Sequence, residues 1–155
     1  MPEFDKDLLS IQEARDLSTK AFEAWKIWSH ASQEQVDRVC AAMSAAALSA
    51  AERLGTMAHE ETGYGYSEHK KLKNEFAARN VWESIKDEKT VGVIHHDPVK
   101  RIYDIAWPVG VIAGLTPSTN PTSTVIYKIM IAVKARDAII IAPHPSAAKC
   151  SYEAA

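Results

Sequence analysis

Cysteine is scarce in this chain, and the excess of positive charge typical of nucleic-acid-binding proteins is missing. The two cysteines, Cys40 and Cys150, are too few and too far apart for a disulfide framework or a metal site. Cys40 falls on an apolar helical stripe, so we expect a small buried core residue there. The formal net charge of -2 at pH 7 provides no basic surface for nucleic acid or an acidic membrane. These shortages argue against a disulfide-stapled protein and against a nucleic-acid partner.

Long apolar runs and metal-ligand spacings are also missing from the sequence. No apolar run approaches the roughly 20 residues of a membrane-spanning helix, and the N-terminus has no basic stretch followed by an apolar one. His59-Glu60-Glu61 lacks the second histidine of a zinc-binding helix, and no ligand set accompanies His95-His96. We therefore expect a cytoplasmic protein without a metal site or a membrane partner.

The composition and the first half of the chain indicate a globular protein that begins with helices. The 155 residues are 46% hydrophobic and 25% charged, which favours one compact unit. Two segments, Ser10–Glu13 and Ser32–Gln35, match the capping box that starts many helices. Apolar residues then recur at helical spacing, which predicts a first helix that includes Trp28 and a second that runs to Gly63.

A third helix is predicted after the glycines that end the second. Ser67 is placed to cap it, and its apolar positions extend to Ile85. Three lysines fall on the side that we expect to face solvent, namely Lys70, Lys71 and Lys73. The simplest interpretation of this lysine cluster is a solvated helix face.

The periodicity changes to that of strands after residue 87. A short apolar strand at 91–95 and an alternating strand at 100–107 predict an antiparallel hairpin, with Pro108 as a natural boundary. From Val109 onward, two continuously apolar strands separated by a helix predict a parallel β-α-β unit. Two parallel strands leave edges that should be paired or covered. We therefore expect a fragment of a longer enzyme or a truncated gene product.

Each predicted parallel strand ends in a turn that leads directly into a helix. The first junction lies within residues 107–123, and the second is Pro143-His144-Pro145-Ser146 after the strand at 138–142. In open α/β sheets, ligands bind outside the carboxyl ends of the strands, where turn amides and helix N-termini face the same space. These two turns are therefore the predicted binding region.

The chain resembles the N-terminal part of CoA-acylating aldehyde dehydrogenases. The resemblance is carried by residues 101–155, with the Thr116-Pro-Ser-Thr-Asn-Pro-Thr and Pro143-His-Pro motifs, and by the upstream segments Ala58-His-Glu-Glu-Thr-Gly-Tyr-Gly and Lys86-Asp-Glu-Lys-Thr-Val-Gly-Val-Ile. It implies an α/β fold with an N-terminal helical region at 1–90 and a β-hairpin extension of the oligomerisation type at 91–107. Residues 108–155 would then begin a Rossmann-like NAD-binding domain.

The resemblance also implies an activity for the complete enzyme. An enzyme of this family would oxidise a small aldehyde, with acetaldehyde the first choice, to an acyl-CoA through a cysteine thioester, using NAD as cofactor and coenzyme A as co-substrate. The catalytic cysteine would lie outside this chain, so the chain alone should be inactive, and a homo-oligomer is implied. Sulfoacetaldehyde is the alternative substrate. The alternative class is a truncated, non-catalytic binding or assembly module, whose amphipathic stretch Leu8–Trp28 would dock on a bacterial microcompartment shell.

Specific site residues follow from the same resemblance. In the first turn, either Asn120 or Thr119 would stabilise the oxyanion, because the two family prolines align Thr119 with the family's asparagine and a one-residue shift restores Asn120. A purely structural interpretation, a helix N-cap followed by Pro121, also explains Asn120.

In the second turn, histidine replaces the usual lysine, and a rigid surface loop is the structural alternative. No lysine or arginine lies at this turn for a 2′-phosphate, which favours NAD over NADP. Proposed cofactor contacts are Thr116, Pro117, Ser118, Thr119, Asn120, His144, Pro145 and Ser146, the last of which would also cap the final helix.

Overall fold

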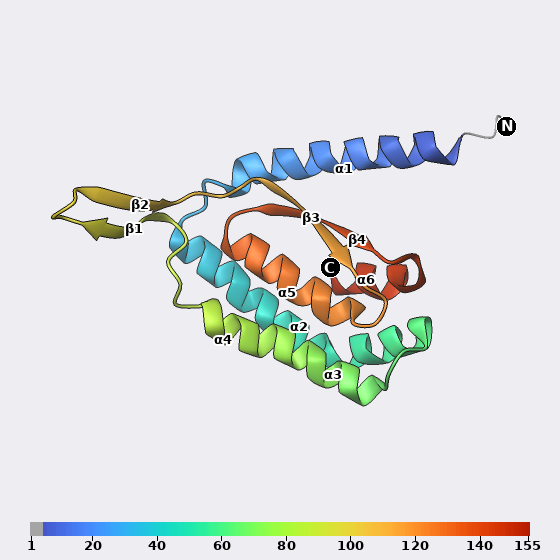
Figure 1. The fold of residues 1–155 in the computed structure, drawn as a ribbon. Coiled ribbons are helices and arrows are strands. Elements are labelled where there is room, and N and C mark those ends of the chain that lie inside the picture. Colours follow the sequence, from blue (N-terminus) through green and yellow to red (C-terminus); the bar gives the residue numbers. More distant parts are fainter. Residues whose placement is uncertain (1–4) are drawn as a thin grey trace.

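The computed structural model describes residues 5–155, with helices on both faces of a small parallel sheet (Figure 1). The sheet consists of β3 (Val111–Thr116) and β4 (Ala138–Pro143). The long helix α1 (Lys6–Trp28) lies along one face of the sheet, and α5 (Pro121–Lys134) covers the other. Within the described residues, no helix combines the length and the apolar character needed to cross a membrane.

The remaining helices pack beyond α5. The helix α2 (Gln33–Thr62) lies against α5, and α3 (Ser67–Glu75) packs along α2. A single π-helical turn at Phe76–Asn80 joins α3 to α4 (Val81–Ile85), so the predicted third helix is one helical rod with a local irregularity. The short helix α6 (Ala148–Ala154) follows β4 and returns to α2 and α5.

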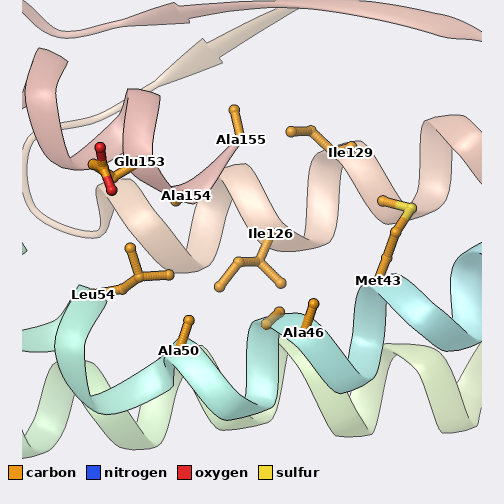
Figure 2. Close-up of a pocket in the computed structure, with 10 residues that line it drawn as sticks. Met43, Ala46, Ala50, Leu54, Ile126, Ile129, Glu153, Ala154 and Ala155 are labelled. Atoms are coloured by element: carbon orange, nitrogen blue, oxygen red, sulfur yellow. The ribbon is translucent and has the colours of Figure 1, made fainter.

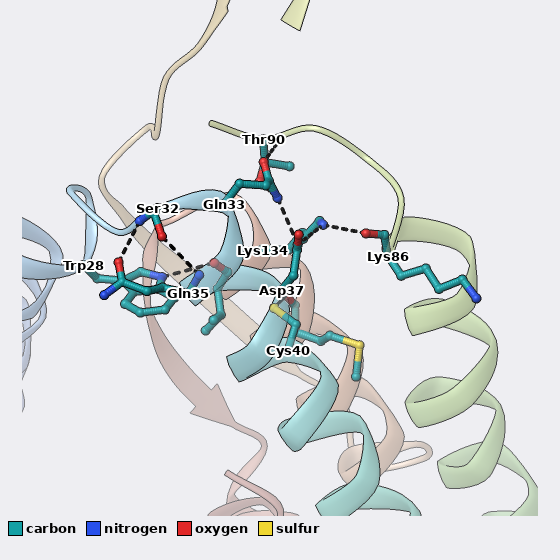
Figure 3. A network of polar contacts seen from close by, with 11 residues as sticks. Trp28, Ser32, Gln33, Gln35, Asp37, Cys40, Lys86, Thr90 and Lys134 are labelled. Carbon is teal, nitrogen blue, oxygen red and sulfur yellow. Dashed lines mark hydrogen bonds and ion pairs between the residues drawn. The ribbon is translucent and has the colours of Figure 1, made fainter. Parts of the chain in front are cut away.

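The two ends of α2 confirm the sequence prediction. The Ser32 side chain accepts a hydrogen bond from the Gln35 amide at 3.2 Å, and the Gln35 side chain accepts one from the Ser32 amide at 2.8 Å (Figure 3). This reciprocal pair satisfies two amides that the first helical turn leaves without partners. At the other end, Gly63 adopts a left-handed conformation with φ 68°, which suits a residue without Cβ.

The predicted starts of α1 and α3 were wrong. The helix α1 begins earlier, because the Asp5 carboxylate accepts a hydrogen bond from the Asp7 amide at 3.0 Å and acts as the N-cap. Ser10 therefore lies inside the helix and caps nothing. Ser67 is the first residue of α3, whereas Tyr66 occupies the capping position without a side-chain hydrogen bond.

The predicted hairpin is confirmed, with strand bounds shifted by one or two residues. The strands β1 (Gly92–Asp97) and β2 (Ile102–Ala106) pair antiparallel and extend away from the helices (Figure 1). The Asp97 carboxylate stabilises the turn by accepting hydrogen bonds from two following amides at 2.9 and 3.0 Å. The apolar side chains of the hairpin are largely exposed, including Val93, Ile94, Ile102, Tyr103 and Ile105.

The parallel β-α-β unit is also confirmed. The strands β3 and β4 pair in register from Val111 with Ala138 to Thr116 with Pro143, and α5 connects them. The main core lies between α2, α5 and the α3–α4 rod, so the N-terminal helices and the β-α-β unit share one apolar interior. The core residues are Leu54, Ala77, Ala78, Ile126 and Met130. The division into domains at residues 90 and 107 stays a prediction.

An ion pair between a buried lysine and a partly exposed aspartate fixes the C-terminal end of α5 (Figure 3). The Lys134 side chain is only 3% exposed, and its ammonium donates to the Asp37 carboxylate at 2.6 Å and to the Lys86 carbonyl at 3.0 Å. Gln33 donates to the same carboxylate at 2.9 Å. Because a buried ammonium needs several acceptors, these contacts hold α5, α2 and the end of the α3–α4 rod together.

Candidate functional site

The carboxyl ends of β3 and β4 bring the two predicted turns side by side. We call residues 116–120 the first turn segment and residues 143–146 the second turn segment. Thr116 pairs with Pro143 in the sheet, and the His144 amide donates to the Thr116 carbonyl at 2.9 Å. Asn120 occupies the N-cap position of α5 as predicted, with Pro121 as the first helical residue, but its side chain makes no capping hydrogen bond. The Asn120 side-chain amide therefore makes its hydrogen bonds outside the cap.

Thr116 stands out in the first turn segment because its hydroxyl is buried without a partner. The residue is 4% exposed, and its Oγ1 has no hydrogen-bond partner among residues 5–155. An unsatisfied buried hydroxyl costs about 1–3 kcal/mol. Such a group at the end of a parallel strand fits contact with a bound ligand. The rest of the segment is accessible, with Pro117 and Thr119 exposed and Ser118 and Asn120 half-buried.

The second turn segment is organised by its histidine. The His144 Nδ1 accepts a hydrogen bond from the Ser146 amide at 3.2 Å and lies 2.8 Å from the Ser146 hydroxyl oxygen. The expectation that Ser146 caps the last helix was wrong. The carboxylate of Glu61 from α2 accepts hydrogen bonds from the amides of Lys149 at 2.9 Å and Cys150 at 2.7 Å. A longer acidic side chain from a neighbouring helix thus replaces the predicted local cap.

Two lysines of α3 hold the first turn segment. The expected solvated face was wrong for Lys70, which is buried, and is confirmed for Lys73, which is exposed. Lys70 is 4% exposed, and its Nζ donates to the Thr119 carbonyl at 3.0 Å. The Lys73 Nζ donates to the Asn120 Oδ1 at 2.7 Å. Burial, and secondly the positive charge of Lys73, lower the pKa of Lys70 from its ordinary value. An (i, i+3) spacing places both lysines on one helix face, and this spacing was the signal available in the sequence.

The next residue on that face of α3 continues the contact. Asn74 is fully buried, and its side chain accepts a hydrogen bond from the Thr122 hydroxyl at 2.8 Å while donating to the Ala51 carbonyl at 3.0 Å. Asn74 thereby joins α2 to the first turn of α5. Lys71 forms an exposed ion pair with Glu52 at 2.8 Å, which agrees with the prediction that this lysine faces solvent.

A mainly apolar groove of about 480 Å³ lies beside Asn120, between α3 and the N-terminal half of α5. Leu72 and Phe76 line it from the α3 side, and Tyr127 lines it from α5. Lys73 is also part of its wall. The groove is therefore adjacent to the first turn segment and can receive a small apolar molecule next to the Asn120 amide.

A different cavity, of about 250 Å³, lies between α2, α5 and the end of α6 (Figure 2). Its lining is apolar apart from Glu153, which forms an ion pair with Arg53 at 3.0 Å. The residues around it include Leu54 and Ile126, which belong to the main core. This cavity is a packing feature between helices and lies apart from the two turn segments.

Neither cysteine is prepared for nucleophilic chemistry. Both are free and buried, as expected for Cys40. Burial raises the pKa of the Cys40 thiol to about 11. Burial and the neighbouring Glu61 carboxylate raise the pKa of the Cys150 thiol to about 12. A nucleophilic cysteine needs a depressed pKa, so both side chains are core residues. In residues 5–155, His, Cys, Asp and Glu side chains form no group of three or more that could hold a metal ion.

Comparison with known sequences places almost the whole chain in one family and matches it to longer enzymes. The sequence profile of the aldehyde dehydrogenase family matches residues 7–155. The bifunctional aldehyde-alcohol dehydrogenase AdhE of Escherichia coli K12 is 40% identical over 94% of this chain, which corresponds to 16% of that enzyme. The sulfoacetaldehyde dehydrogenase of an Acholeplasma species is 39% identical over 83% of this chain and 27% of its own length. The chain thus spans about a sixth of the length of the first relative.

Solved structures show the same arrangement. An acetylating aldehyde dehydrogenase from Geobacillus thermoglucosidasius superposes with a TM-score of 0.95 and 55% identity over 99% of this chain and 34% of that structure. A propionaldehyde dehydrogenase from the fucose utilisation microcompartment of Clostridium phytofermentans superposes with a TM-score of 0.70 and 30% identity over 90% of this chain and 32% of its own. The helices, hairpin and β-α-β unit therefore match part of acylating enzymes.

Proposed function

The chain belongs to the aldehyde dehydrogenase family, and we propose that the natural protein carrying it is a CoA-acylating aldehyde dehydrogenase. That protein would oxidise a small aldehyde with NAD and transfer the acyl group to coenzyme A through a cysteine thioester. The observation that carries the proposal is the juxtaposition of the two turn segments, with the unpartnered Thr116 hydroxyl and the anchored Asn120 amide at one edge of the sheet.

The residues of both turn segments would hold the cofactor. The contacts would come from Thr116, Pro117, Ser118, Thr119 and Asn120 in the first segment and from His144, Pro145 and Ser146 in the second. The partnerless Thr116 Oγ1 supports a fit to a polar cofactor, because a ribose or amide group would satisfy it. NAD supplies the hydride acceptor when it is bound. The second turn segment contains no lysine or arginine for a 2′-phosphate, which favours NAD over NADP.

Asn120 is the better of the two candidates for stabilising a developing oxyanion. Its Oδ1 is held by Lys73, so its NH2 group is the part that remains to donate. Thr119 instead directs its carbonyl toward Lys70, and its hydroxyl oxygen lies 3.4 Å from the Asn120 Nδ2. A fixed amide donor aimed at a forming negative charge is a main source of rate enhancement in acyl-transfer chemistry.

The groove between α3 and α5 would receive the aldehyde. Its apolar walls favour a small unsubstituted substrate such as acetaldehyde. Sulfoacetaldehyde, the alternative, would bring a sulfonate that needs a cation, and the lysine in this wall is already engaged with Asn120. Comparing the kcat/KM values for the two aldehydes measures this preference directly.

The nucleophile would come from another part of the natural protein, because both thiols of this chain are buried and have raised pKa values. We therefore expect the purified 155-residue chain to form no NADH from acetaldehyde, NAD and CoA. The natural protein should form NADH and acetyl-CoA together. NADH formation by the 155-residue chain would contradict this assignment of the catalytic groups.

The partners are also proposals. The exposed apolar side chains of the hairpin, together with Trp107 at 80% exposure, favour burial in a homo-oligomer. A cytoplasmic location is proposed from the composition. The alternative, an assembly module docked on a microcompartment shell, depends on the exposed Leu8, Leu9 and Ile11 of α1. Deleting residues 1–30 discriminates: loss of shell binding by a folded protein supports docking, whereas aggregation supports a structural role on the sheet.

A further inference from the structure

The proposed oxyanion donor, Asn120, is contacted by a helix that is distant in sequence. The contacting lysines lie in α3, and Asn120 lies 47 residues after Lys73. Lys70 is only 4% exposed, and the one acceptor that residues 5–155 offer its ammonium is the Thr119 carbonyl in the first turn segment. Burying a charge for one contact is costly unless that contact is structurally useful.

Lys73 determines which end of the Asn120 amide is free. An ammonium group has only donors, so the atom 2.7 Å from Lys73 Nζ must be the Asn120 oxygen. The NH2 group therefore occupies the opposite branch of the planar amide. Without this contact the amide could rotate and offer its oxygen instead, which would repel a developing oxyanion. The weak 3.4 Å contact with the Thr119 hydroxyl is too long to fix the amide by itself.

Lys70 fixes the backbone of the same residue. It draws the Thr119 carbonyl toward α3 through a 3.0 Å hydrogen bond. The peptide bond between Thr119 and Asn120 is planar and trans, so the Asn120 backbone N–H points away from this carbonyl. The two lysines thus orient both the backbone and the side-chain donors of one residue.

We propose that Lys70 and Lys73 are positioning residues that hold Asn120 so that its backbone N–H and the N–H of its NH2 group that is not directed at the Thr119 hydroxyl can donate to the reacting oxygen. The inference rests on the proposed function, because it assigns the lysines a part in that reaction. They act through Asn120, although Lys73 also lines the groove proposed for the aldehyde. Their effect should therefore appear in kcat more than in cofactor affinity.

The experiment compares three variants of the natural full-length protein, assayed for acetyl-CoA formation from acetaldehyde, NAD and CoA. Lys73→Met removes the donor while keeping an apolar stem, Lys73→Arg restores a donor, and Lys71→Met is the matched control on the solvent side of α3. We expect Lys73→Met to lower kcat about tenfold, a fraction of the effect of deleting an oxyanion donor. The NAD dissociation constant should stay within about twofold, Lys73→Arg should recover most of kcat, and Lys71→Met should be unchanged.

Two outcomes overturn the proposal while leaving the proposed function standing. The first is that the Lys73→Met variant of an active enzyme keeps the wild-type kcat. The second is that its kcat falls in proportion to a lower melting temperature or weaker NAD binding, and Lys73→Arg does not restore it. If the wild-type protein forms no acyl-CoA, the proposed function fails. A crystal structure of Lys73→Met then tests separately whether Lys73 orients the Asn120 amide. A rotated Asn120 amide supports the positioning role, and an unmoved amide refutes it.

Discussion

Replacing Gly55 with alanine should destabilise the protein, although alanine is the better helix former. Gly55 is buried in α2 where α3 crosses it. A Cβ at this position would lie 2.7 Å from the Lys71 backbone nitrogen and 2.9 Å from the Ser67 carbonyl oxygen. Both neighbours are backbone atoms, so a side-chain rotation cannot relieve the contact.

The magnitude follows from two opposed contributions. Alanine in a helix interior is favoured over glycine by about 1 kcal/mol. Forcing α3 away from α2 costs about 1–3 kcal/mol, the usual range for overpacking. We therefore expect the free energy of unfolding to fall by up to about 2 kcal/mol. The displacement would also move the segment of α3 that carries the lysines of the first turn segment.

Urea unfolding followed by circular dichroism measures this effect through the transition midpoint. Thr56→Ala is the control, because residue 56 is exposed in the same helix and the change should leave stability equal or slightly increased. If Gly55→Ala stabilises the protein as Thr56→Ala does, α2 and α3 do not approach as closely as described, and the reasoning is refuted.

Three further predictions concern the caps, the Lys134–Asp37 ion pair and the thiols. Ser32→Ala should lower the free energy of unfolding by about 1 kcal/mol, whereas Ser10→Ala should change it little, because only the first serine caps a helix; equal effects in thermal melts would contradict the observed start of α1. Asp37→Ala leaves the buried ammonium of Lys134 without its carboxylate and should cost about 2 kcal/mol, less than for a fully buried pair because Asp37 is partly exposed; a neutral result in urea would show that the ion pair contributes nothing. The two cysteines should react with a thiol reagent only after unfolding, and fast labelling of native protein at pH 8 would disprove their burial. Folding raises the pKa values of both thiols above 9.0, so the thiols of the unfolded chain ionise at lower pH than those of the folded one. Thiol ionisation should therefore lower the free energy of unfolding as the pH rises from 9 toward 11.

Most of the features that the sequence could predict are encoded within one segment, although the local cap predictions at Ser10 and Ser67 were wrong. The capping box at Ser32 and the end of α2 at Gly63 depend on residues a few positions apart, and the structure confirms both. The change from helical to strand periodicity likewise predicted the hairpin and the parallel β-α-β unit. The position of Asn120 before Pro121 followed from the same local chemistry.

Contacts between distant segments could not be obtained in this way. Periodicity showed that Lys70 and Lys73 share a helix face, but not that Lys70 is buried against the first turn segment or that the exposed Lys73 reaches Asn120. The partnerless Thr116 hydroxyl was equally hidden, because burial of one side chain depends on the whole tertiary arrangement. Glu61 replaced the predicted cap of Ser146 for the same reason, since the two lie far apart in the sequence.

The most direct test of the central claim is to follow acetaldehyde oxidation by the natural protein with NAD, in the presence and absence of coenzyme A, and to identify the product by mass spectrometry. The account predicts NADH formation that depends on coenzyme A and is matched by an equal amount of acetyl-CoA. Sustained NADH formation without coenzyme A, with acetate as the product, would contradict the acylating assignment, and a protein that forms no NADH with any small aldehyde would contradict the proposed activity altogether.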